Sequence, residues 1–447
     1  MSGASKLDRI APPEFVTSII QRLWEKGHEV YIVGGAVRDA LLGRRHQDWD
    51  LATTASAAQI RRIFPDIRHY QLKSETVSLV GPDYKVEVTP FRGGDPMALQ
   101  EDLAHRDFTI NALAYCPRRE QLIDPFGGLA DLRRRKIRAV GSPMDRFRED
   151  PIRLLRAVRL CVELGMDIEV STQKSMETAA RLIESCAAER IRDELTKILV
   201  VPTPSVAFHL LRRTGLISYI LPELLEGYLK RQNKYHRYTI FRHIMVTLDT
   251  VKPTLLLRLV ALLHDIGKPR TRTRHRGHWR FLGHEEESAK LAEQIMERLR
   301  FSSGLTRKVA HLVRHHLIEY NPQWSDSAVR RWIRKVGIEN AEILIIFRRA
   351  DLLAHATPLA DRDLRLLQEF EKRVKEILSA KNSVFAPSGL AVDGEDVMRL
   401  LGIPPGPEVG KVLKGLLELV TENPELNTRK QLVDILLKGY EPGKSNG

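Results

Sequence analysis

The sequence predicts an α/β head, residues 1–140, followed by a helical neck (141–220), a helical body (221–380) and a helical tail (381–447). A chain of 447 residues usually forms about two to four domains. Strand-like and helix-like runs alternate only in the first part of the chain. Beyond it, apolar residues recur mainly at helical spacing, as in Asp150–Gly165. These two observations carry the predicted fold class.

Three segments of the head are expected to be strands. Tyr31–Val33 and Val77–Val80 are short apolar runs typical of buried strands, and Lys85–Phe91 alternates like a half-exposed strand. They predict a small mixed sheet with flanking helices. In the tail, residues 382–388 are expected to form a linker, and Val409–Glu422 a last helix.

The composition excludes several classes of protein. A hydrophobic share of 43% and a charged share of 29% are ordinary for a globular chain and exclude a disordered chain, a collagen or a transmembrane bundle. The longest apolar stretch, Leu255–Leu263, is too short to span a bilayer, so no membrane partner is expected. The first fifteen residues lack the apolar core of a secretory signal. Three cysteines without paired spacing favour a reducing compartment, and we expect a cytoplasmic protein.

The charge balance points to a polyanionic partner. Lysines and arginines number 71 against 57 acidic residues, which gives a net charge of +14. A large basic excess favours nucleic acid, because neutralising phosphates releases counterions.

A phosphate-binding turn is expected where the first strand ends. Gly34 and Gly35 follow the strand and lead into a helix, so the backbone can approach a ligand closely. Arg38 lies in the first turn of that helix and can add charge-assisted hydrogen bonds.

Two neighbouring carboxylates sharpen this hypothesis. Asp48 and Asp50 are two residues apart, so on a strand they point to the same face. Oxygen ligands of this kind suit Mg²⁺, and nucleotidyl transfer often uses two such ions. Glu87, on the alternating strand, is the best candidate for a third catalytic carboxylate.

Two further clusters are candidate nucleotide-binding residues. Arg106 and Asp107 can hold a triphosphate and a ribose hydroxyl, or form a surface ion pair. Asp150 and Arg153, three apart on a predicted helix, can bind base edges or form an ion pair that caps the helix. The same run adds two arginines, Arg156 and Arg159.

These motifs resemble those of the class II tRNA nucleotidyltransferases, the family of CCA-adding enzymes and bacterial poly(A) polymerases. The resemblance rests on the ordered set GGAVRD, DWD, RDFTINA, DPFGG and EDPIRLLRAVR over residues 25–220. It implies a polymerase-beta-like nucleotidyltransferase head that binds metals and triphosphate at its first motif. It also implies ribose selection by Arg106 and Asp107, protein-based recognition of the base by Asp150 and Arg153, and a bracing helix at Ala188–Leu199.

The resemblance implies template-independent transfer to the 3′ acceptor end of tRNA. Only nine residues, Gly93–Glu101, stand where complete CCA-adding enzymes carry a long flexible loop. This resembles the CC-adding branch, so we expect addition of two cytidines from CTP. Complete CCA addition, or poly(A) synthesis from ATP, remains an alternative. His105 replaces a usual arginine but leaves Arg106 intact.

A second site is predicted in the body, where ten of the fifteen histidines lie between His236 and His355. Neutral imidazoles with carboxylates suit a divalent metal. The ordered spacing of a histidine, an adjacent His-Asp pair and a later aspartate resembles the HD phosphohydrolase superfamily. It implies a set of four ligands: His243, His264, Asp265 and Asp351. His284 and His315 are expected to bind a second metal or to orient phosphate. A hydrolase of phosphate esters or cyclic nucleotides, with the head as a binding module, is the other alternative.

Overall fold

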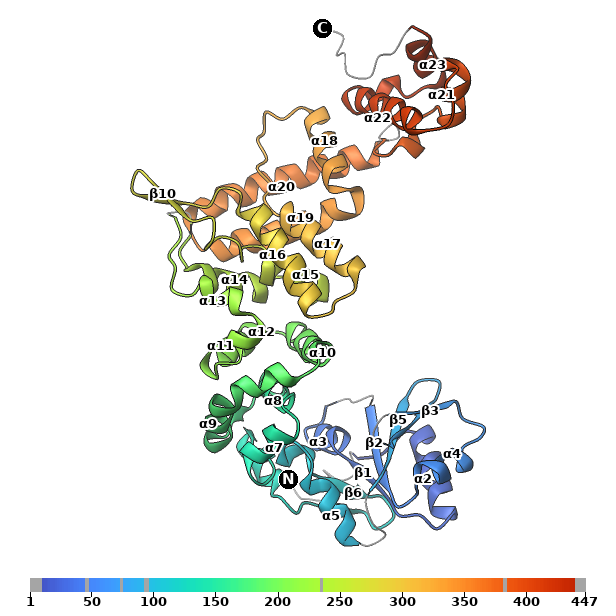
Figure 1. Ribbon diagram of the computed structural model, residues 1–447, viewed down its shortest axis with the longest axis vertical. Coiled ribbons are helices and arrows are strands. Elements are labelled where there is room, and N and C mark those ends of the chain that lie inside the picture. Colours follow the sequence, from blue (N-terminus) through green and yellow to red (C-terminus); the bar gives the residue numbers. More distant parts are fainter. Residues whose placement is uncertain are drawn as a thin grey trace. The chain divides into compact units, whose positions relative to one another are not determined.

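The computed structural model describes residues 10–44, 48–72, 75–91, 96–233, 236–380 and 384–438. The chain divides into two compact units (Figure 1). The first comprises residues 1–198 and 206–220, and the second residues 199–205 and 221–447. A sheet-containing head followed by a mainly helical remainder confirms the predicted fold class. No helix in the described part of the chain is long and apolar enough to cross a membrane.

The first unit contains a seven-stranded mixed sheet. Strands β2 and β5 pair in parallel, whereas the other neighbours in the sheet are antiparallel. The three strands expected from the sequence are confirmed. In spatial order the strands are β3 (His69–Gln71), β4 (Val77–Val80), β5 (Lys85–Pro90), β2 (Asp48–Thr53), β1 (Val30–Val33), β6 (Ala114–Cys116) and β7 (Gln121–Ile123).

Helices pack on the sheet and bury its apolar residues. Helix α2 (Glu14–Glu25) buries a face with apolar residues three or four apart, and packs with α4 (Ala57–Ile63) against the strands. Tyr31 and Val33 belong to a cluster that includes two leucines of helix α5 (Pro96–Ala104) (Figure 1). Each strand of the sheet interior therefore contributes side chains to a packed core.

The expected short loop is only partly a loop. Residues 92–95 lie outside the described residues. Helix α5 begins at Pro96, so the second half of the segment expected as a loop, up to Glu101, is helical. The helix ends at Ala104, so the second predicted motif, with Arg106 and Asp107, begins directly after it.

The rest of the first unit is helical apart from one small parallel pair. Strand β8 (Lys136–Ile137) pairs with β9 (Asp167–Ile168), so the neck is not purely helical as expected. The physical reason is Gly165, whose left-handed φ of 61° ends α8 and turns the chain back toward β8. The remaining elements are α3 (Gly35–Leu41), η1 (Thr109–Asn111), α6 (Gly128–Arg134), α7 (Pro143–Glu149), α8 (Arg153–Leu164), α9 (Val170–Ala179), η2 (Ala180–Ser185), α10 (Ala188–Leu199), α11 (Ser205–Arg213) and α12 (Ile217–Ile220).

The second unit is built from long helices around the histidine-rich segment. Helices α14 and α19 pack together, and α15 contacts both α17 and α19. Its helices are α13 (Pro222–Glu226), α14 (Ile240–Thr250), α15 (Leu255–Leu263), α16 (His284–Arg298), α17 (Ser303–Arg314), α18 (Asp326–Val336), α19 (Ile338–His355), α20 (Pro358–Ser379), α21 (Gly394–Leu401), α22 (Pro407–Glu422) and α23 (Arg429–Leu437), with short turns η3 (Pro387–Gly389) and η4 (Pro424–Leu426).

The expectation of an all-helical body is wrong at one hairpin. Strands β10 (Thr273–His275) and β11 (His278–Arg280) pair antiparallel. Arg276 and Gly277 both have positive φ, at 46° and 79°, as two-residue hairpin turns require. Alternating arginines, threonines and histidines give this segment no apolar helical face.

The tail has its own core. The predicted helix at its centre is confirmed as α22. Of the expected linker, Asn382 and Ser383 lie outside the described residues. Val384 is buried in the tail core, so that part of the segment is packed.

Candidate functional site

A polar cavity of about 450 Å³ lies in the first unit and gathers most of the residues expected to bind nucleotide. Sequence-distant elements contribute to it: the β1–α3 turn, strand β2, the segment after α5, and helices α8 and α10. Its lining residues are Gly34, Gly35, Arg38, Asp39, Asp48, Asp50, His105, Arg106, Asp107, Asn111, Asp150, Arg153, Arg156, Arg159, Glu163, Glu194 and Lys197. Glu87 is the one predicted head residue that does not line it.

The two aspartates of β2 lie at this cavity beside a third carboxylate. Asp50 is the register partner of Glu87 on the parallel strand β5. Burial, with smaller contributions from Glu87 and Asp48, raises the pKa of Asp50 to about 6, although Arg106 lowers it. Lys85 pairs with Glu87 at 2.6 Å. Carboxylates that repel one another in this way fit a site for divalent cations.

Gly34 allows the backbone to approach these groups. Its φ is 73°, in the region that favours glycine. A Cβ there would lie 3.2 Å from Asp50 Oδ2 and 3.2 Å from Arg106 Nη1. The glycine therefore lets the carboxylate and the guanidinium come together over the start of α3.

Arg38 is buried and its guanidinium is already occupied. It donates to both oxygens of Asp39 at 2.9 Å each and to Asn111 Oδ1 at 2.6 Å. Arg38 thus ties helix α3 to the segment of the second motif.

The second motif places its two residues differently. Arg106 lines the cavity and pairs with Asp102 at 3.4 Å. Asp107 is buried and accepts from Asn111 Nδ2 at 2.9 Å and from Arg156 Nη1 at 3.1 Å. Burial opposes ionisation of Asp107, but Arg156 and these hydrogen bonds keep its pKa below the usual value.

Asp150 and Arg153 do not share a helix face, which corrects the sequence prediction. Helix α7 ends at Glu149, Asp150 caps it in an extended conformation, and α8 begins at Arg153. Pro151 separates the two helices because proline disfavours helical geometry in the preceding residue. Arg153 donates to Glu149 at 2.9 Å and to the His105 carbonyl at 2.7 Å.

The arginines of α8 are held by a buried glutamate of α10. Glu194 accepts from Arg159 Nε at 2.6 Å and lies 3.6 Å from Arg156 Nε. Arg159 also donates to Glu163 at 2.6 Å. A chain of alternating charges thus runs from Asp107 through the cavity wall to α10.

A second candidate site lies in the body, where the four expected ligands converge. Five of their pairwise distances, between His243 Nε2, His264 Nε2, Asp265 Oδ2 and Asp351 Oδ1, lie between 2.9 and 3.5 Å. A cation about 2.1 Å from each ligand would have ligand edges of about 3.0–3.4 Å, so the spacing fits a metal. All four side chains are buried.

The electrostatics of this cluster also fit a cation. Burial lowers the pKa of His264, but Asp265 and Asp351 outweigh it and raise the pKa to about 9. Burial raises the pKa of both aspartates, but neighbouring imidazoles and basic groups hold it well below the usual value. Neither oxygen of buried Asp265 has a hydrogen bond of good geometry. A buried carboxylate needs compensating positive charge, which the Lys268 ammonium, 2.7 Å from Asp265 Oδ2, supplies in part and a bound cation would complete.

The other oxygen of Asp265 faces a second donor group. Asp265 Oδ1 lies 3.4 Å from His284 Nε2 and 3.8 Å from His316 Nε2. The expectation for His315 is wrong. Helix α17 ends at Arg314, so His315 turns away and stacks edge-on with His311, whereas His316 turns inward.

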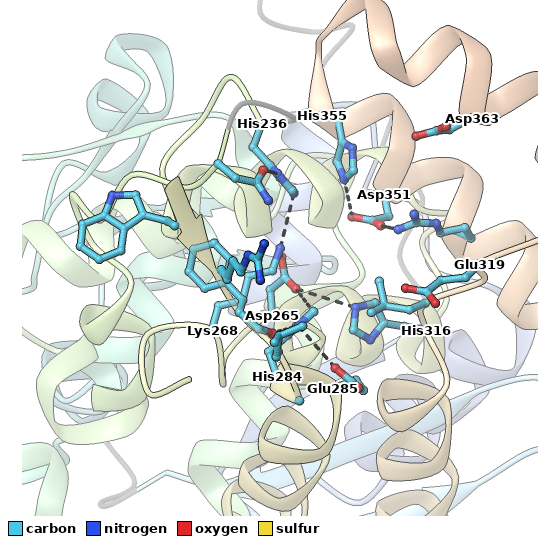
Figure 2. Close-up of a pocket in the computed structure, with 18 of the residues that line it drawn as sticks. His236, Asp265, Lys268, His284, Glu285, His316, Glu319, Asp351, His355 and Asp363 are labelled. Atoms are coloured by element: carbon cyan, nitrogen blue, oxygen red, sulfur yellow. Dashed lines mark hydrogen bonds and ion pairs between the residues drawn. The ribbon is translucent and has the colours of Figure 1, made fainter. Parts of the chain in front are cut away.

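Basic groups surround the carboxylates in a cavity of about 480 Å³. Figure 2 shows Asp265 between His236 and His355 on one side and His284 on the other. Lys268 Nζ lies 2.7 Å from Asp265, and Arg348 donates to Asp351 at 2.6 Å. Burial lowers the pKa of His355 to about 4, so its imidazole is neutral at pH 7.

Several residues at the two sites were missed from the sequence. Glu194, Lys197 and Arg190 lie in the predicted bracing helix, Ala188–Leu199, but were not predicted to be site residues; Arg190 binds Asp150. Glu163 lies beyond the fourth motif. In the body, the role expected of His315 belongs to His316. The position of Lys268, three residues after Asp265, was a sequence signal for the contact between them.

Family models match three segments of the chain. Residues 30–138 match the family described as "Poly A polymerase head domain", and residues 165–227 match "Probable RNA and SrmB- binding site of polymerase A". Residues 238–356 match the "HD domain" family. The chain thus combines a nucleotidyltransferase head with an HD domain.

Full-length relatives then give the family. The A-adding tRNA nucleotidyltransferase of Deinococcus radiodurans is 34% identical over 87% of this chain and 90% of its own. The CC-adding tRNA nucleotidyltransferase of Thermus thermophilus is 33% identical over 94% of this chain and 96% of its own. The crystal structure of the Bacillus stearothermophilus CCA-adding enzyme with CTP matches with a TM-score of 0.69 and 27% identity, over 96% of this chain and 98% of that chain. This chain belongs to the CCA-adding tRNA nucleotidyltransferase family.

Proposed function

We propose that this enzyme adds two cytidines from CTP to the 3′ end of tRNA without a nucleic-acid template. In this reaction the tRNA 3′-hydroxyl attacks the α-phosphate of CTP, and the bond to the leaving pyrophosphate breaks. The observation that supports the proposal best is the cavity that gathers Asp48 and Asp50 with the arginines of the neck.

The residues of the cavity have separate roles in this proposal. Asp48 and Asp50 hold Mg²⁺, with Glu87 as a third carboxylate beside them. When bound, Mg²⁺ ions supply positive charge to the attacking and leaving oxygens. The Gly34–Gly35 turn and Arg106 bind the triphosphate, and Arg38 and Asp107 position the second motif.

Selection of the base is assigned to the start of the neck. A carboxylate can accept from the cytosine amino group, and an arginine can donate to base acceptors. Asp150 and Arg153 are the groups available for this, while Arg156 and Arg159 complete the wall behind them.

The choice of CC addition depends on the nine residues Gly93–Glu101, too few for the long loop of complete CCA-adding enzymes. The Thermus relative carries a CC-adding name, but the Deinococcus relative, equally similar, carries an A-adding name. The test is to sequence tRNA ends after incubation with CTP alone, ATP alone and both. Addition of two cytidines and no terminal adenosine supports the proposal. A terminal adenosine contradicts it, and a long adenosine tract would indicate poly(A) synthesis.

We propose four functional parts: a catalytic head (1–140), a base-recognising neck (141–220), an HD-type body (221–380) and a tRNA-binding tail (381–447). The net charge of +14 supports RNA binding. The three cysteines are free, which supports a reducing compartment, the cytoplasm.

We also propose that the body is a metal-dependent phosphohydrolase. His243, His264, Asp265 and Asp351 would hold a divalent metal, and its charge would polarise a phosphate ester. The supporting observation is the convergence of their four ligand atoms. Metal analysis tests it: His264→Ala should lose bound metal, and unchanged metal content would contradict the site.

A further inference from the structure

A basic hairpin, residues 271–281, borders the body cavity and is not explained by the metal site. It carries four arginines and two histidines in eleven residues. Arg274, Arg276 and Arg280 are exposed, and none has an ion-pair partner among the residues that the structure describes. By contrast, Arg270, just before the hairpin, is neutralised by Glu226 at 2.7 Å. Clustered, unneutralised guanidinium groups favour a polyanionic ligand.

One face of the hairpin combines these charges with aromatic rings. Arg274 lies opposite Trp279 in the antiparallel register, so the two share a face. The Arg272 guanidinium lies 3.6 Å from the centre of the Trp279 ring, and that of Arg274 lies 5.7 Å away. Rings flanked by arginines provide stacking surfaces for bases and charges for the phosphates between them.

This face leads into the cavity of the metal site. Trp279 and Phe281 both line the cavity, and Lys268 lies 5.7 Å from the centre of the Phe281 ring. Lys268 in turn contacts Asp265. A strand lying along the hairpin would therefore present its end to the proposed metal ligands.

We propose that the basic hairpin binds a single-stranded RNA end, so that the body acts on a phosphate ester at the end of an RNA chain rather than on a free nucleotide. The part that concerns substrate rests on the proposed phosphohydrolase function; the binding of a strand does not. For a 3′-phosphate, water supplies the oxygen of the new P–O bond, the ester P–O bond breaks, and the products are a 3′-hydroxyl and inorganic phosphate.

Phosphate release by the full-length chain tests the substrate. The substrates are an oligoribonucleotide with a 3′-phosphate and free cytidine 3′-monophosphate, assayed with a divalent metal and no nucleoside triphosphate. We expect the oligonucleotide to be preferred, and the double variant Arg274→Gln/Arg276→Gln to lower its kcat/KM by about tenfold. The mononucleotide rate should stay within about twofold, since neither arginine lines the cavity.

A matched control keeps the net charge change the same. Lys290 and Arg307 are exposed residues of α16 and α17 without an ion pair among the described residues. The double variant Lys290→Gln/Arg307→Gln should behave as the parent enzyme. Equal losses on both substrates, or equal losses in both double variants, overturn the proposal.

Photocrosslinking tests the binding without catalysis. The same oligonucleotide, with 4-thiouridine at its last position, should form adducts within residues 271–281, and Arg274→Gln/Arg276→Gln should reduce them. Adducts confined to other segments overturn the proposal. If no substrate is hydrolysed but the hairpin is crosslinked, the phosphohydrolase function fails and the strand-binding surface stands.

Discussion

Arg190 donates to both carboxylate oxygens of Asp150, at 2.9 and 2.8 Å. The two residues are 40 positions apart: Asp150 caps α7, and Arg190 lies in the first turn of α10. Because Arg190 binds both carboxylate oxygens, it fixes the orientation of the Asp150 side chain. The bracing helix α10 therefore acts directly on a residue assigned to base selection.

Substituting Arg190 should weaken the choice of base. In Arg190→Ala, Asp150 loses two charge-assisted hydrogen bonds, each worth about 1.5–3 kcal/mol when well formed, although exposure reduces this. We expect the preference for CTP over UTP, measured as a ratio of kcat/KM, to fall by about tenfold. Arg181→Ala, which removes an exposed arginine paired with Glu184, is the control. An unchanged ratio would show that Arg190 does not set the orientation of Asp150.

Adding a single methyl group at Gly34 should damage the head site. Gly34→Ala strains a positive φ by about 1–3 kcal/mol and brings Cβ to 3.2 Å from Asp50 and Arg106. Nucleotide incorporation should fall by at least about tenfold. Gly141 also has a positive φ, of 63°, but nothing lies near its Cβ. Gly141→Ala should therefore be strained yet active, and an equal loss in both variants would refute a specific role for the Gly34 contact.

Protons should compete with Mg²⁺ at Asp50. Its pKa is raised to about 6, chiefly by burial. The carboxylate must be ionised to bind a cation, so competition is present below pH 6 and is lost above it. We expect the Mg²⁺ concentration for half-maximal rate to rise about tenfold for each pH unit below 6.

A variant of Glu87 provides a control for this pH dependence. Glu87→Gln removes a like charge beside Asp50, so the pKa of Asp50 should fall and the onset of competition should move to lower pH. A Mg²⁺ requirement that does not vary between about pH 5 and pH 8 would contradict the role of Asp50 as a ligand.

Two adjacent histidines offer a matched test of the body site. His316 lies in the buried cluster with Asp265, whereas His315 contacts His311 outside the cavity. His316→Asn should lower metal-dependent hydrolysis of p-nitrophenyl phosphate by about 10–100-fold, and His315→Asn should leave it within about twofold. A larger loss of hydrolysis in His315→Asn than in His316→Asn would contradict the assignment of His316 to the second donor group.

The sequence predicted local chemistry well because short-range rules govern it. The two-residue period of a strand was enough to predict that Asp48 and Asp50 lie on the same face. Both line one cavity, together with the expected glycines and arginines. Contacts between residues far apart in the sequence could not be predicted. No local pattern around Asp150 predicts its contact with Arg190, and none around Arg159 predicts its contact with Glu194.

Where prediction failed, a turn or helix end decided the outcome. Pro151 breaks the helix expected through Asp150. Because α17 ends at Arg314, His316 and not His315 faces Asp265. The basic hairpin was missed because its turn depends on positive φ at Arg276 and Gly277, and only the glycine signals this in sequence.

The most direct measurement of the central claim is incorporation of CTP into tRNA that lacks its 3′ end, by the parent enzyme and by Asp48→Asn and Asp50→Asn at saturating Mg²⁺. We expect that the parent enzyme adds two cytidines and that each variant loses at least about a thousandfold in rate while retaining tRNA binding. Undiminished cytidine addition by either variant would contradict it.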